Sequence, residues 1–262
     1  MNRSTPAWFA GARASLASAG SILLDAVFPP RCAACRTWSE ELFCAACQAS
    51  LHPIEAPLCE RCGIPFDPQL HTAAECAACR TNRYHAAPPY ETLRSVFAFE
   101  GALRHAVHRF KYQDKTALAA PLAGLLHNFL LQSSTRERHI PAENLGAVVP
   151  VPLHAWRRYR RGYNQSELLA RELARLLDVP MIDALTRVRH TTPQVELRKK
   201  QRRDNVRGAF AMREAAHRYG VEGAVLLIDD VCTTGATLGE CARVLREAGF
   251  SSVYALTLAR QL

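Results

Sequence analysis

The chain has 262 residues, 48% of them hydrophobic and 22% charged, which is ordinary for a soluble globular protein of one large or two modest domains. No apolar stretch is long enough to span a bilayer, because the longest near the amino end, 15–28, is interrupted by Asp25. We therefore expect no membrane span. The formal net charge of +9 and the pI of about 9.2 fit a polyanionic partner, although a solvated basic surface would give the same balance.

Residues 1–30 predict an amphipathic helix. Its apolar side chains approximate one helical stripe, and Pro29 and Pro30 end the pattern. A secretory signal peptide is the alternative interpretation, but no small-residue cleavage site stands at the right place. We therefore expect a helix that docks onto another surface.

Residues 31–84 are defined by cysteines. Eight of the ten cysteines in the chain lie here as four Cys-x-x-Cys pairs: Cys32/Cys35, Cys44/Cys47, Cys59/Cys62 and Cys76/Cys79. Each pair can form a knuckle, and two knuckles supply the tetrahedral four-sulfur cage that zinc prefers. The spacing predicts two structural zinc ions in a double zinc ribbon. The simplest pairing is sequential along the chain, and an interleaved pairing is the alternative.

Disulfides and iron–sulfur clusters are less favoured interpretations of the cysteines. Disulfides would need an oxidising compartment, for which no export signal is present, and iron–sulfur clusters are the remaining alternative. A segment this short buries little apolar surface, so its fold should depend on the metals. Closed four-cysteine sites leave no coordination position for a substrate. The ribbons are therefore expected to bind nucleic acid, to grip a partner protein or to brace the larger domain.

Residues 85–262 predict one α/β domain, a parallel sheet with helices on both faces. An alternating strand is expected at 92–99, and 147–152 is expected to be the first parallel strand. Helices are expected at 102–111, 118–131 and 166–177. A strand at 225–228, a helix from about 238 to 248 and a strand at 252–258 complete the pattern.

A basic loop follows the strand at 147–152. It carries four arginines, Arg157, Arg158, Arg160 and Arg161. Guanidinium groups pair with phosphate oxygens two at a time, so the loop suits a pyrophosphate or a nucleic-acid backbone, or it is a solvated surface. Interleaved aromatic residues, Trp156, Tyr159 and Tyr163, favour nucleic acid, because bases stack on such rings. Residues 187–207 form a second basic segment.

The stretch 225–237 carries the clearest chemistry. A buried strand ends in Asp229 and Asp230, and a small-residue loop, 231–237, leads into a helix. Free backbone N–H groups and the helix dipole make such a loop suited to a phosphate monoester. The two carboxylates suit hydroxyl groups or a hard cation, so ribose 5-phosphate is a ligand of the right kind. We expect the Cys232 side chain to point away from the loop and Cys241 to lie in the core.

This stretch resembles the phosphoribosyl pyrophosphate (PRPP) signature of type I phosphoribosyltransferases. The resemblance implies that PRPP binds with Mg²⁺ and that Asp229 and Asp230 are the catalytic pair, holding the ribose hydroxyls and the metal. It places Thr233 to Thr237 on the 5-phosphate, and the PRPP site as a whole comprises Asp229, Asp230, Val231, Cys232, Thr233, Thr234, Gly235, Ala236 and Thr237. The basic loop with Arg157, Arg158, Arg160 and Arg161 would take the pyrophosphate, and 187–207 would fold over PRPP.

The whole chain resembles the ComF family of competence-associated proteins with a phosphoribosyltransferase domain. Besides the signature and the knuckles, the resemblance rests on Phe28-Pro29-Pro30-Arg31-Cys32, on 160–165, on 191–194 and on 205–210. It implies a cytoplasmic role in DNA uptake, with single-stranded DNA and competence-machinery proteins as partners. The alternative is a catalytically active phosphoribosyltransferase with an unidentified acceptor and no DNA role. The domain boundaries that follow are 1–30, 31–84 and 85–262.

Overall fold

The computed structural model describes residues 30–67, 74–80, 88–112, 116–132, 140–154, 159, 162–189, 204–218 and 220–262. The helix predicted for residues 1–30 lies outside this part except for Pro30, as do Trp156, the four arginines of the basic loop and residues 190–203. Within the described part, no helix is both long and apolar enough to cross a bilayer.

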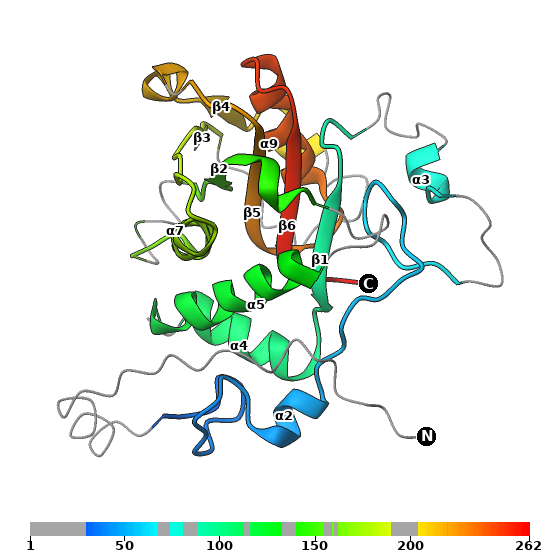
Figure 1. Ribbon diagram of the computed structural model, residues 1–262, viewed down its shortest axis with the longest axis vertical. Helices are drawn as coiled ribbons and strands as arrows, with labels where there is room; N and C mark the ends of the chain where they lie inside the picture. Colours follow the sequence, from blue (N-terminus) through cyan, green and yellow to red (C-terminus); the bar gives the residue numbers. More distant parts are fainter. Residues whose placement is uncertain are drawn as a thin grey trace.

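A four-stranded sheet forms the centre of the larger domain, with the strand order β1-β6-β5-β2. Its strands are β1 (Leu93–Ala98), β2 (Leu145–Pro150), β5 (Ala224–Cys232) and β6 (Val253–Arg260). All three neighbouring pairs are parallel (Figure 1). The prediction that 147–152 is the first parallel strand was wrong, because β1 precedes it and pairs with β6. The expected alternation of buried and exposed residues in this strand was also wrong, since all six residues of β1 are buried.

Helices cover both faces of this sheet, which confirms the predicted fold class. They are α4 (Gly101–Tyr112), α5 (Ala119–Gln132), α7 (Gln165–Leu177) and α9 (Ala236–Glu247). Successive side chains of a strand point to opposite faces. Leu226 and Ile228 accordingly pack in one core with α4, α5 and α7, whereas Val225 and Leu227 pack in another with α9.

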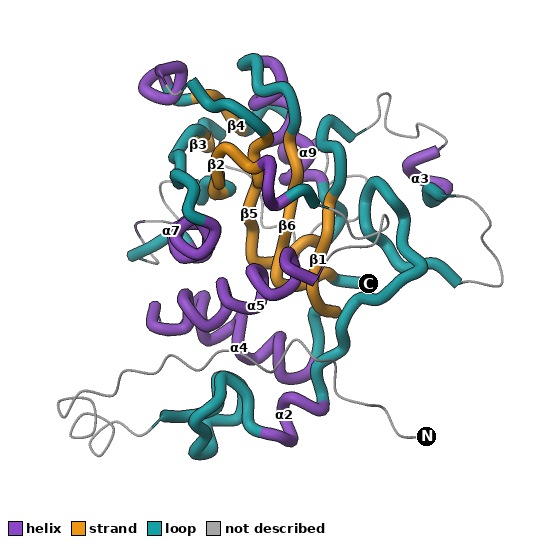
Figure 2. The backbone as a smooth tube through the Cα atoms, in the orientation of Figure 1, coloured by secondary structure: helices purple, strands orange, loops and turns teal. Residues whose placement is uncertain are grey.

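The remaining elements are short (Figure 2). A two-stranded antiparallel sheet, β3 (Leu185–Arg187) with β4 (Phe210–Met212), joins the α9 side of the core. The other short elements are the helices α2 (Ala45–Ala49) and α3 (Ala77–Arg80) and the 3₁₀ turns η2 (Thr116–Leu118), η3 (Ala142–Asn144) and η5 (Glu214–Arg218).

The cysteine-rich segment covers the outer edge of β1. The backbone N–H groups of Ala98 and Ile54 donate to the carbonyl oxygens of His52 and Val96, at 2.8 and 2.9 Å, and Leu93 N–H donates to Arg61 O at 2.8 Å. These bonds satisfy backbone groups that an edge strand would otherwise leave open. They also explain the burial of β1. Figure 1 shows the blue segment that follows α2 beside this strand.

Candidate functional site

The acid pair and the loop lie at the carboxyl end of β5, where parallel sheets hold their ligands. β5 runs to Cys232 and α9 begins at Ala236, so the loop comprises three residues, fewer than the seven expected from 231–237. Gly235 ends it with φ of +76°. A Cβ there would lie 3.3 Å from Leu93 Cδ2 and would need a left-handed backbone that L side chains rarely adopt. The tight turn into α9 therefore requires glycine.

Two hydrogen bonds fix the loop between β5 and α9. Thr234 Oγ1 accepts a bond from Ala236 N–H at 3.4 Å, and Gln261 N–H donates to Cys232 O at 2.9 Å. The Cys232 side chain is 2% exposed and packs in the core with α9, as does the fully buried Cys241. Both thiols are therefore buried in the core, as expected from the sequence.

The two acids differ in their surroundings. Asp229 Oδ1 accepts bonds from Ser166 Oγ at 2.8 Å and from Asp230 N–H at 2.9 Å. Burial, and after it the neighbouring charge of Asp230, raises the pKa of Asp229 to about 7. Asp230 is largely buried, and its Oδ1 lies 2.8 Å from Lys111 Nζ.

This arrangement fits a hard divalent cation with sugar hydroxyls. The raised pKa of Asp229 means that two adjacent carboxylates repel each other in a poorly solvated place. A cation such as Mg²⁺ would relieve that repulsion through the oxygen ligands it prefers. Asp229 and Asp230 would hold it when it arrives with a phosphorylated ligand.

The end of the predicted pyrophosphate loop lies next to the acids. Asn164 caps α7: its side-chain oxygen accepts Ser166 N–H at 3.2 Å, and its Nδ2 donates to Val151 O at 3.0 Å. These bonds hold the segment after β2 against the start of α7, from which Ser166 reaches Asp229. Of the predicted arginines and aromatic residues in this loop, Tyr159 and Tyr163 belong to the described part, and Tyr159 is 88% exposed.

Sequence reasoning missed Lys111 and Ser166. Lys111 stands in the last turn of a helix, where a basic residue usually serves the helix dipole, and Ser166 reads as an ordinary first-turn residue. Neither position carries a motif. Only the tertiary fold brings the last turn of α4 and the start of α7 to the end of β5, and with them both side chains to the acid pair.

The eight knuckle cysteines gather in two tetrads, and this confirms the sequential pairing. One contains Cys32, Cys35, Cys44 and Cys47, the other Cys59, Cys62, Cys76 and Cys79, and within each the ligand atoms lie within 4.8 Å of one another. The sulfurs of Cys35 and Cys44 are 3.6 Å apart and those of Cys62 and Cys76 are 3.7 Å apart. A tetrahedral site with Zn–S bonds of about 2.3 Å has sulfur–sulfur edges of about 3.8 Å. Both donor sets therefore fit structural zinc.

The tetrads differ in burial. In the first tetrad Cys35 is exposed and Cys44 and Cys47 are half-buried, whereas all four cysteines of the second are buried. The first ribbon lies against α4, where Arg109 Nη1 donates to Cys32 O and Ala33 O at 3.1 and 2.9 Å. The second lies against β1 and the end of β6.

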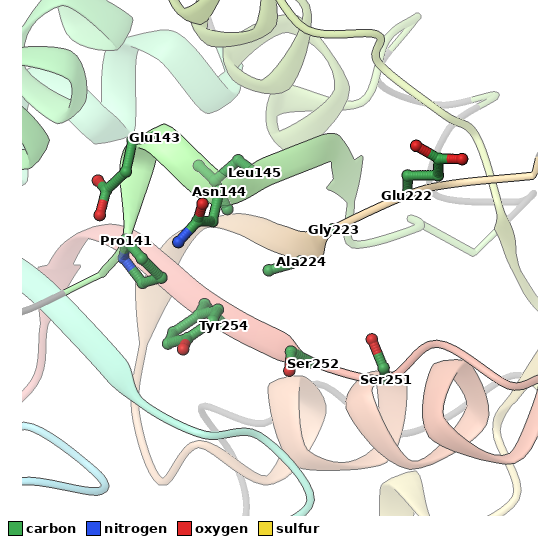
Figure 3. A pocket seen from close by; sticks show the side chains of 10 residues that line it. All are labelled: Pro141, Glu143, Asn144, Leu145, Glu222, Gly223, Ala224, Ser251, Ser252 and Tyr254. Atoms are coloured by element: carbon green, nitrogen blue, oxygen red, sulfur yellow. The ribbon is translucent and has the colours of Figure 1, made fainter.

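A hollow with a volume of about 500 Å³ opens at the amino ends of β2, β5 and β6. Figure 3 shows it between the side chains of Asn144, Tyr254 and Ser252. It lies at the opposite end of β5 from the acid pair, because β5 begins at Ala224 beside the hollow. Ligands of parallel sheets bind at the carboxyl ends, so the hollow is separate from the candidate site.

The parallel sheet, the acid pair before a glycine-ended loop and the two cysteine tetrads define a phosphoribosyltransferase-type domain joined to a double zinc ribbon. Family models agree: one for the double zinc ribbon domain matches residues 23–80, and one for the phosphoribosyl transferase domain matches 164–262.

Curated relatives cover most of the chain. Competence protein F of Haemophilus influenzae is 32% identical over 83% of this chain and 90% of its own length. DNA utilization protein YhgH of Salmonella typhi is 33% identical over 84% of this chain and 90% of its own length. Competence protein ComFC of Bacillus subtilis is 30% identical over 84% of this chain and 85% of its own length. The chain belongs to the ComF family.

Proposed function

We propose that this protein binds PRPP together with Mg²⁺ at residues 229–237 and handles single-stranded DNA in the cytoplasm, in the DNA-related role for which its relatives are named. The observation that carries the PRPP half is the acid pair placed beside the three-residue loop at the carboxyl end of β5. Competence-machinery proteins are further proposed partners, by the same relationship.

The residues have separate roles in this proposal. Asp229 and Asp230 hold the ribose hydroxyls and the accompanying Mg²⁺, and Thr233 to Thr237 hold the 5-phosphate with backbone N–H groups and hydroxyls. The metal neutralises phosphate charge when bound. Ser166 keeps the Asp229 carboxylate oriented through the bond at 2.8 Å.

The alternative is an active phosphoribosyltransferase with an unidentified acceptor and no DNA role. Transfer would require no protein nucleophile, because loss of pyrophosphate leaves an oxocarbenium-like sugar that positioning and nearby charge stabilise. Pyrophosphate release measured with candidate acceptors separates the two. Release together with absence of DNA binding would favour the enzyme.

Replacing both acids, Asp229→Asn with Asp230→Asn, is expected to weaken PRPP binding at least about a hundredfold, since each charged contact contributes about 1.5–3 kcal/mol. Loss of the Asp229 charge should not destabilise the fold, because burial raises the pKa of this carboxyl. Loss of the Asp230 charge removes its ion pair with Lys111, and Asn keeps the side-chain oxygen as an acceptor there. Calorimetry with PRPP and excess Mg²⁺, beside a thermal melt, measures both quantities. PRPP affinity equal to that of the wild type in a folded variant would disprove the site.

For the DNA half, Arg157→Ala with Arg160→Ala and Arg161→Ala should reduce the slope of log K against log[salt] by about 2, at roughly 0.7 per phosphate contact. Removing the 88% exposed ring with Tyr159→Ala should weaken binding and leave the slope unchanged, because stacking releases no counterions. Mixed-sequence single-stranded oligonucleotides titrated at several salt concentrations measure both effects.

The matched control removes three arginines elsewhere, on α7 and α9: Arg171→Ala, Arg175→Ala and Arg246→Ala. It has the same net charge as the loop variant and should keep a slope near the wild-type value. If the two triple variants behave alike, net charge alone accounts for the binding and the loop has no specific role. If the wild-type protein does not bind single-stranded DNA at low salt, the proposed DNA-binding role is wrong.

A further inference from the structure

Lys111 reaches the acid pair from outside the strand–loop–helix unit. It stands in the last turn of α4, and its Nζ lies 2.8 Å from Asp230 Oδ1. The two side chains are 21% and 10% exposed, so this ion pair is screened less than one on the surface. Its charge also acts on Asp229, whose pKa it lowers against the larger effects of burial and of Asp230.

The end of α4 is held in place at this site. Phe110 is fully buried, and its carbonyl accepts a hydrogen bond from the Tyr163 hydroxyl at 2.6 Å. Tyr163 directly precedes Asn164, the residue that caps α7 beside Asp229. The turn that carries Lys111 is therefore connected to the segments that form the site, and the lysine is not a loose surface residue.

The Lys111 ammonium and a ligand with a bound cation would compete for the same carboxylate oxygens. When both acids are ionised, two carboxylates and one ammonium carry a net charge of −1. A phosphorylated ribose that arrives with a divalent cation takes the carboxylate oxygens for its hydroxyls and metal, so the ammonium must leave Asp230. A lysine has a flexible four-carbon stem and binds phosphate as a point charge. The phosphate oxygens of the ligand would then be strong acceptors for the ammonium.

We propose that Lys111 is a PRPP-binding residue that exchanges partners: it pairs with Asp230 in the free protein and with phosphate oxygens when PRPP and the metal bind. This inference rests on the proposed PRPP site. It has a second consequence, because the ammonium competes with a divalent cation for Asp230. Metal alone should bind poorly, and metal and PRPP should strengthen each other's binding reciprocally.

The test compares Lys111→Met with wild type in two titrations, Mn²⁺ alone followed by paramagnetic relaxation and PRPP with saturating Mg²⁺ followed by calorimetry. Removing the ammonium should strengthen Mn²⁺ binding up to about fivefold, as the loss of one competing ion pair implies. It should weaken PRPP binding about 10- to 100-fold, as expected for a lost contact to a charged group. A purely structural role would not move the two affinities in opposite directions.

Two further variants complete the experiment. Lys111→Arg keeps the charge and should retain most of the PRPP affinity. Arg104→Met removes a charge from an exposed position of the same helix and should change neither titration. Unchanged PRPP affinity in a folded Lys111→Met protein would overturn the inference, and so would unchanged Mn²⁺ affinity. Wild-type protein that binds no PRPP would instead overturn the proposed function, and the Mn²⁺ titration would still show whether Lys111 competes with metal.

Discussion

Cys62→Ser is expected to destabilise the whole phosphoribosyltransferase-type domain and to impair PRPP binding, because the second zinc ribbon is built into the sheet. The knuckle that begins at Cys59 bonds to β1 through Arg61 O, which accepts Leu93 N–H at 2.8 Å, and through Glu60 O, which accepts Thr92 Oγ1 at 3.0 Å. The guanidinium of Arg260, at the end of β6, donates to Cys62 O.

One residue, Leu93, connects the second zinc ribbon with the three-residue loop between β5 and α9. Leu93, whose N–H bonds the knuckle, also lies under Gly235, where an added Cβ would be 3.3 Å from its Cδ2. Gly63 makes the approach of the knuckle close enough: its φ is +66°, and a Cβ there would meet Leu93 O at 2.5 Å. Displacement of the knuckle therefore shifts the residue on which the loop rests.

Cys35→Ser is the matched comparison. Cys35 is exposed, and the first ribbon bonds to α4 through Arg109, whereas the second bonds to β1 and to Arg260. Metal analysis should give two zinc ions in the wild type and one in each variant. Loss of the second zinc should cost at least about 3 kcal/mol and lower the melting midpoint by roughly 10 °C. Loss of the first zinc should leave the PRPP affinity within about twofold of the wild-type value, a difference of only about 0.4 kcal/mol in binding free energy.

The prediction fails if Cys62→Ser loses its zinc and keeps both the wild-type midpoint and the wild-type PRPP affinity. The ribbon would then be a separate unit, as the sequence-based boundary at 84 and 85 implies. Iron with visible absorption, in place of zinc, would overturn the assignment of the metal.

Arg94→Met is expected to destabilise the protein by about 3–5 kcal/mol, the usual cost of breaking a buried charge pair. Arg94 is 1% exposed, and its guanidinium donates to Glu60 O at 2.7 Å and to Leu93 O at 2.9 Å. Burial lowers its pKa to about 10, so it keeps its charge at neutral pH. Removal would take the charged donor from both carbonyls in a dry environment and leave Glu60 O with the Thr92 hydroxyl, at 3.0 Å.

The second zinc site can balance the buried positive charge of Arg94. Four thiolates around Zn²⁺ carry a net charge of −2, and the guanidinium groups of Arg94 and the 3% exposed Arg260 carry +2. The thiols of Cys59 and Cys62 act to favour the charged form of Arg94. We therefore expect Arg94→Met also to speed the transfer of the second zinc to a chelator.

Arg109→Met is the control for this variant. It removes the half-buried arginine that holds the carbonyls of the first ribbon, so it should speed the release of the first zinc and spare the second. Denaturant unfolding and zinc-release kinetics, followed with a metallochromic dye, measure the two effects. Wild-type stability and wild-type zinc release in Arg94→Met would show that the guanidinium does not balance the zinc centre.

Short-range patterns were sufficient for much of this protein. Four Cys-x-x-Cys knuckles predicted two zinc ribbons, because the ligands of one knuckle are neighbours in the chain and two consecutive knuckles complete one tetrahedron. The stretch 225–237 likewise predicted a strand, a phosphate-type loop and a helix, because the acids, Gly235 and the apolar spacing all lie within a few turns of chain. Helix periods located α4, α5, α7 and α9 to within a few residues.

Long-range packing set the rest, and no local pattern encodes it. β1 pairs with β6, and the cysteine-rich segment bonds along its other edge, so Arg94 is buried between segments that are far apart in the sequence. Lys111 meets Asp230 because the fold brings the last turn of α4 to the carboxyl end of β5, although the two residues belong to distant segments. A local motif predicts which chemical groups a segment carries. The partner of each buried charge depends instead on which segments the fold brings within about 3 Å of it.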